Sequence, residues 1–71
     1  MPKAQITKNE MMENVKRGYR LQALRLAKGL KASWVADKMG VSGSLICYLE
    51  TGRRRWTDSL EQKFLKAIGE L

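Results

Sequence analysis

Apolar residues recur at helical spacing through the middle of the chain, in two short segments separated by one glycine. Residues 32–39 and 42–50 each carry apolar side chains on one face, and Gly40 stands between the segments. A glycine suits the end of the first helix because it adopts a left-handed conformation without strain, and Ser42 is placed to cap the second. The pattern therefore predicts a helix-turn-helix whose inward positions are Val35, Met39, Val41, Ile46 and Leu49.

Helical spacing continues on both sides of this motif. Residues 19–28 place two leucines toward a core and end favourably at Lys28-Gly29, with a cation in the last turn and a glycine after it. Downstream, Thr57 or Asp58 caps a last helix with an apolar face of Leu60, Phe64, Leu65 and Ile68. We therefore expect a helix before the motif and a helix after it.

The N-terminal stretch predicts one more helix. Thr7 and Glu10 have the spacing of a capping box, and the apolar residues that follow recur at helical spacing. Gly18 is unfavourable inside a helix, so we expect a break or kink there. The expected organisation is an all-α fold of four to five short helices, with residues 1–16 as an N-terminal arm or extra helix and residues 17–71 as one small helix-turn-helix domain.

Positive charge is concentrated on the motif. The 71 residues carry a net charge of +7, and ten of the fourteen Lys and Arg residues lie between positions 16 and 55, against two acidic residues. Such a distribution favours a polyanion such as DNA, because each neutralised phosphate releases counterions. The alternative is a solvated basic surface that only aids solubility.

Fifteen residues between about Gly18 and about Ile68 stand at the spacing of a known family. They are Gly18, Leu21, Leu24, Arg25, Gly29, Leu30, Val35, Ala36, Gly40, Val41, Ser42, Ile46, Leu49, Glu50 and Gly52. In this register the chain resembles the Xre or Cro type of helix-turn-helix regulator, the phage-repressor class. The resemblance implies a lambda-repressor-like DNA-binding domain, a role as a transcriptional repressor of phage, prophage or mobile-element type, and a homodimer on an inverted-repeat operator.

The helical period and the resemblance together indicate which residues contact double-stranded DNA. Four residues share the outer face of the second motif helix, which in the family enters the major groove; these candidates for base contact are Gly43, Ser44, Cys47 and Tyr48. For Tyr48 the alternative is packing against a neighbouring helix. Phosphate contacts are expected from basic or helix-terminal positions, namely Arg17, Arg20, Lys31, Ala32, Ser33, Ser42, Arg53, Arg54 and Arg55.

Two charged residues are expected to serve the fold. The family counterparts of Arg25 and Glu50 form a largely buried ion pair between the first helix and the end of the recognition helix, so we expect a structural ion pair. Trp56 is expected to close the core. Trp34 is expected to be covered by the N-terminal arm or a second subunit, or to be an ordinary partly exposed ring.

The sequence argues against several other classes of protein. It has no histidine and one cysteine, so we expect no metal, no cofactor and no enzymatic activity. We expect Cys47 to be either a small neutral side chain that fills space or a redox-sensitive thiol. No apolar run is long enough to span a membrane, and the N-terminus lacks a signal sequence, so a cytoplasmic location is expected.

Two alternative functions stay open on the sequence. The chain is consistent with the DNA-binding antitoxin of a toxin–antitoxin pair, whose arm would contact the toxin partner. In a different class, it is consistent with a basic helical protein-interaction module that meets an acidic protein or a membrane surface. A membrane-binding helix should expose a continuous apolar face. Here most apolar residues are expected to be buried in the core, so this second alternative ranks last.

Overall fold

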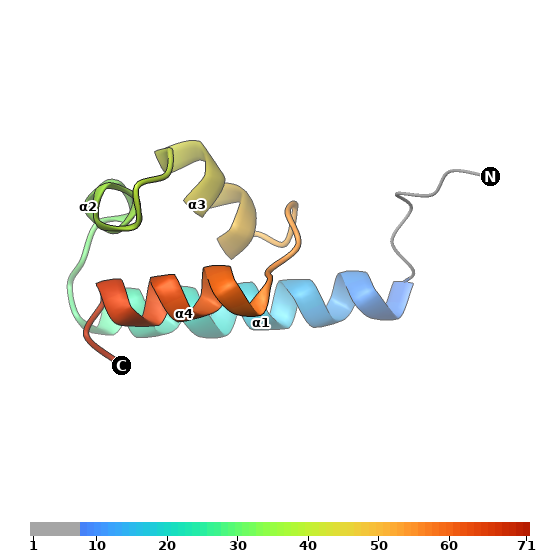
Figure 1. Ribbon diagram of the computed structural model, residues 1–71. Helices are drawn as coiled ribbons and strands as arrows, with labels where there is room; N and C mark the ends of the chain where they lie inside the picture. Colours follow the sequence, from blue (N-terminus) through green and yellow to red (C-terminus); the bar gives the residue numbers. More distant parts are fainter. Residues whose placement is uncertain (1–7) are drawn as a thin grey trace.

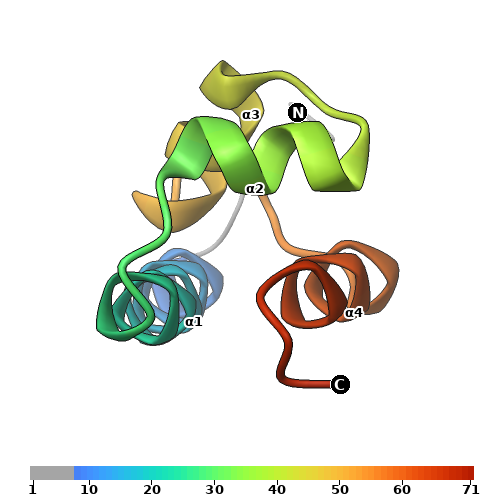
Figure 2. The ribbon, with the colours of Figure 1, turned by 90° about the vertical axis from the view of Figure 1, so that its left-hand side faces the viewer.

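The computed structural model describes residues 8–71, which form four α-helices and no strand (Figure 1). The helices are α1 (Lys8–Ala27), α2 (Ala32–Met39), α3 (Gly43–Glu50) and α4 (Asp58–Ala67). The predicted all-α fold is therefore confirmed. The helix-turn-helix consists of α2 and α3, and Figure 2 shows α2 crossing above α1 and α4.

The motif helices begin and end where the sequence signals predict. Gly40 closes α2 in the left-handed conformation, with φ of 73°. The hydroxyl of Ser42 accepts a hydrogen bond of 3.1 Å from the amide of Leu45 and so caps α3. Of the two residues expected to cap the last helix, Thr57 does so, because its hydroxyl accepts from the amide of Leu60 at 3.1 Å.

One apolar core joins all four helices. Trp56 is buried, its ring meets that of Phe64 edge to face at 5.4 Å, and its indole nitrogen donates to the carbonyl of Leu49 at 2.9 Å. The prediction that Trp56 closes the core is confirmed. The buried apolar residues are Leu21, Val35, Ala36, Ile46, Leu49, Trp56, Phe64 and Ile68.

The expected break at Gly18 is wrong, because α1 is one continuous helix of 20 residues. Gly18 has a different function: a Cβ atom at this position would lie 2.6 Å from the carbonyl oxygens of both Leu49 and Glu50. The glycine therefore lets the backbone at the end of α3 approach α1 closely. The residue expected to cap the N-terminal helix, Thr7, lies outside the described residues.

Candidate nucleic-acid interface

Helix α3 has one buried face and one exposed face. Ile46 and Leu49 are fully buried, whereas all four predicted base-contacting residues are exposed. Tyr48 is 42% exposed, so part of the residue faces solvent. An added Cβ at Gly43 would meet no atom within 4 Å, which leaves open space at the N-terminal end of the helix. The four exposed residues are Gly43, Ser44, Cys47 and Tyr48.

The start of α2 presents backbone amides beside polar side chains. Lys31 and Ser33 are exposed and Ala32 is half-buried. Lys31 occupies the N-cap position, but no side chain there accepts a hydrogen bond from the helix. The first-turn amides, together with the positive end of the helix dipole, therefore remain available to an anion such as phosphate.

The turn after α3 carries three exposed arginines. The amides of Arg53 and Arg54 both donate to the carbonyl of Tyr48, at 2.8 and 3.1 Å, so the turn is fixed to the end of α3. The guanidinium of Arg55 forms an ion pair with Glu10 at the start of α1. Among residues 8–71, the guanidinium groups of Arg53 and Arg54 have no carboxylate partner, which leaves their donors available for phosphate.

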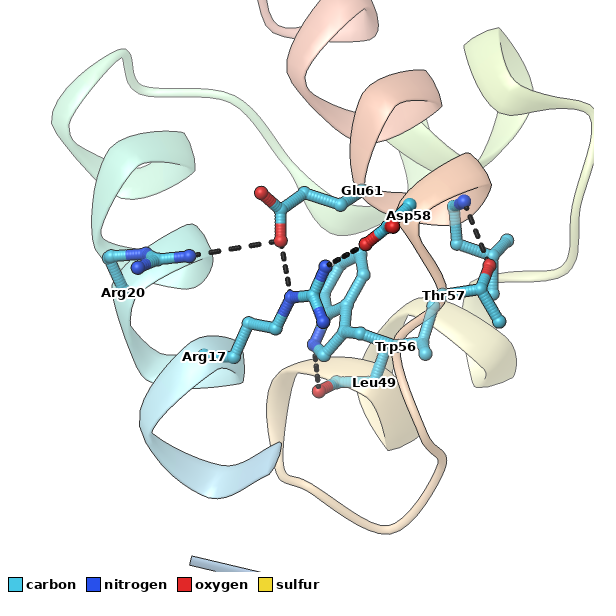
Figure 3. A network of polar contacts seen from close by, with 8 residues as sticks. Arg17, Arg20, Leu49, Trp56, Thr57, Asp58 and Glu61 are labelled. Atoms are coloured by element: carbon cyan, nitrogen blue, oxygen red, sulfur yellow. Dashed lines mark hydrogen bonds and ion pairs between the residues drawn. The ribbon is translucent and has the colours of Figure 1, made fainter. Parts of the chain in front are cut away.

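Arg17, one of the expected phosphate contacts, is paired with carboxylates of α4. Its guanidinium donates to Glu61 and, at 3.2 Å, to Asp58, and it thereby ties α1 to the start of α4 (Figure 3). The hydrogen bond that Arg17 donates to the Glu61 carboxylate raises the pKa of Arg17 above its ordinary value. Arg20 is mostly exposed and lies 3.7 Å from the same Glu61 carboxylate. The pairing partners are distant in sequence, and no local signal at Arg17 indicated them.

Arg25 and Glu50 form a buried, bidentate ion pair. The two hydrogen bonds measure 2.7 and 2.8 Å, and a third guanidinium nitrogen donates to the carbonyl of Leu30 at 2.7 Å. Gln22, which the sequence did not single out, adds a hydrogen bond of 3.3 Å to Glu50. The pair joins α1 to the end of α3, so it fixes the recognition helix and holds no free charge for a ligand.

Two further residues of interest are Cys47 and Trp34. Cys47 is a free thiol on the exposed face of α3. Trp34 is a partly exposed ring, and the ammonium of Lys38 lies 5.2 Å from its centre. Within residues 8–71 there is no group of three His, Cys, Asp or Glu residues arranged to hold a metal ion. Among residues 8–71, no helix combines the length and the apolar character that crossing a membrane requires.

Comparison with known families agrees with this geometry. The sequence model of a family described as "Helix-turn-helix domain" matches residues 18–69, from the middle of α1 to just beyond α4. A search of curated proteins found no match. The match covers both motif helices and the turn that follows α3.

Proposed function

This chain belongs to the helix-turn-helix domain family, and on that premise we propose that it is a sequence-specific DNA-binding transcriptional repressor of Xre or Cro type. It acts by binding double-stranded DNA in the compartment that holds the DNA, the cytoplasm, and it has no catalytic step. The phage, prophage or mobile-element type of repressor is the one its motif residues resemble.

The exposed face of α3 is the observation that carries this proposal. Its buried face holds the helix in the core, while the opposite face presents the hydroxyl groups of Ser44 and Tyr48 and the bare backbone of Gly43. A helix of this kind fits the major groove of B-DNA, where hydroxyl groups bond to base edges and an aromatic ring edge meets a thymine methyl group. Cys47 lies between them on the same face.

Phosphate contacts on both sides of α3 complete the proposed interface. The start of α2 offers Lys31, Ala32 and Ser33, and the turn after α3 offers Arg53 and Arg54. Ser42 and Arg20 are further candidates at its rim. Such contacts fix the position of the protein on the duplex but do not read sequence, so we assign discrimination between operators to α3. Two copies on an inverted repeat would double the number of base contacts.

Fluorescence anisotropy tests the proposal directly. The labelled duplex is the DNA upstream of the chain's own gene, and the control is a random duplex of equal length. We expect clear preference for the upstream duplex, with tighter binding at low salt. Tyr48→Ala should reduce that preference by weakening binding to the upstream duplex by roughly 1–3 kcal/mol while leaving the weak random binding nearly unchanged. Absence of binding to either duplex at low salt would contradict DNA binding.

A further inference from the structure

An apolar groove lies between the N-terminal half of α1 and the turn after α3. Its volume is about 620 Å³. Its apolar lining residues, which we call its floor, are Met11, Met12 and Val15, and Thr51 and Gly52 line it from the turn. The two methionine side chains are 55% and 56% exposed. Its charged lining residues are Lys16 and Arg53, which we call its basic edge. Because most of its lining comes from α1, we call the whole surface the α1 groove.

The α1 groove joins a part of the chain outside the family match to a part inside it. Residues 8–17 precede the matched region, which begins at residue 18, whereas the turn after α3 lies within it. The turn after α3 and helix α1 are in tight contact, because a Cβ atom at Gly52 would lie 2.6 Å from a methyl group of Val15. The N-terminal half of α1 is therefore packed against the turn that follows the recognition helix.

We propose that the α1 groove binds a segment of a partner protein that carries acidic side chains beside large apolar ones. Exposed methionines suit such a ligand, because their flexible, polarisable side chains adapt to the shape of an apolar partner. The charged groups at the groove, Lys16 and Arg53, are both basic, and neither has a carboxylate partner among residues 8–71. An apolar floor with a positive edge complements an acidic, apolar segment.

The composition of the groove argues against other ligands. DNA backbone contacts depend on basic and polar groups. Lys16, Thr51 and Arg53 supply such groups here, but a phosphate chain would leave the apolar surface of Met11, Met12 and Val15 uncovered. A small apolar molecule is held in a pocket that buries most of its surface, whereas this surface is formed by exposed side chains of a single helix and a turn. An amphipathic protein segment matches both the apolar floor and the basic edge.

Partner binding should also compete with DNA binding, an inference that rests on the proposed function. Arg53 lines the α1 groove and is also one of the two arginines assigned to phosphate. A carboxylate that pairs with Arg53 removes that donor from DNA and adds negative charge near the duplex. The bound partner would thus weaken repression through a residue that both ligands use.

Selection of randomised peptides on the immobilised full chain tests the groove. Enriched peptides are synthesised and titrated against the wild type, Met12→Asp, Lys16→Glu and the control Lys63→Glu, which makes the same charge change on α4. We expect the enriched peptides to combine acidic and large apolar residues. They should bind Met12→Asp and Lys16→Glu at least about fivefold more weakly than the wild type, and Lys63→Glu equally well. Met12 and Lys16 are exposed, and circular dichroism checks that the variants fold.

Three results would overturn the inference: no enrichment, enriched peptides without acidic residues, or binding that both groove variants retain. A wild-type dimer that Met12→Asp dissociates in sedimentation would instead assign the groove to a second copy of this chain. Adding peptide to the anisotropy assay should weaken binding to the upstream duplex. Since the peptide titration contains no DNA, failure of the groove and failure of DNA binding are observed separately.

Discussion

Gly18 is a residue at which tertiary contact opposes helix propensity. Gly18→Ala would gain about 1 kcal/mol in an isolated helix. In this structure the added methyl group would lie 2.6 Å from two backbone carbonyl oxygens, which cannot rotate away as a side chain does. Overpacking of this kind costs about 1–3 kcal/mol. We therefore expect Gly18→Ala to lower the free energy of unfolding, as measured by urea denaturation.

Gly43→Ala is the matched control for this prediction. Gly43 also lies in a helix, but an added Cβ there would meet no atom within 4 Å. Its free energy of unfolding should stay the same or rise by up to about 1 kcal/mol. If Gly18→Ala were as stable as Gly43→Ala, the close approach of α1 to the end of α3 would be contradicted.

At the scale of helices, the buried pair of Arg25 and Glu50 decides whether α3 stays attached to α1. Removing one partner, as in Arg25→Ala, leaves a buried charge and should lower the free energy of unfolding by about 3–5 kcal/mol. That loss is comparable to the whole stability of a small domain. Urea denaturation followed by circular dichroism measures it.

The double variant Arg25→Leu with Glu50→Leu distinguishes a packing effect from a charge effect. With both charges replaced by apolar groups, we expect recovery of most of the lost stability. Equal destabilisation in the single and double variants would mean that the shape of the two side chains, and not the uncompensated charge, determines the cost. DNA binding should fail in Arg25→Ala only to the extent that the protein unfolds.

The ends of the helices show how much of this fold the sequence predicts. Local signals at Gly40, Ser42 and Thr57 predict the end of α2 and the starts of α3 and α4, and the expected motif helices 32–39 and 42–50 agree with α2 and α3 to within one residue. The break expected at Gly18 was wrong, because the atoms that require a glycine belong to α3, more than thirty residues away. Propensity describes a residue's own helix and carries no information about a distant backbone.

The candidate interface likewise has features that the sequence predicts and features that it does not. Helical period alone predicts the exposed face of α3, because residues such as Ser44 and Tyr48 alternate with buried ones at fixed offsets. The ion pairs of Arg17 with Glu61 and of Arg55 with Glu10 join residues 44 and 45 positions apart, so no local pattern reveals them. Net positive charge therefore predicted a polyanion partner but not which cations are available to it.

For the molecule as a whole, the dependence of DNA affinity on salt measures how many of these cations reach phosphate. Each phosphate contact adds about 0.9 to the slope of log affinity against log salt. Arg54→Ala should therefore lower the magnitude of that slope by about 1 and weaken binding to the upstream and random duplexes alike. Anisotropy titrations at several salt concentrations measure both quantities.

Arg17→Ala is the control that makes the slope informative, because it removes the same charge from a side chain already paired with Asp58 and Glu61. We expect its slope to match the wild type. Its free energy of unfolding should fall by about 1–3 kcal/mol, because the hydrogen bond to the charged Glu61 carboxylate is partly buried. If Arg17→Ala lowered the slope as much as Arg54→Ala, Arg17 would have to leave α4 on binding. The interface would then extend along α1, and the ion pairs with α4 would be broken in the complex.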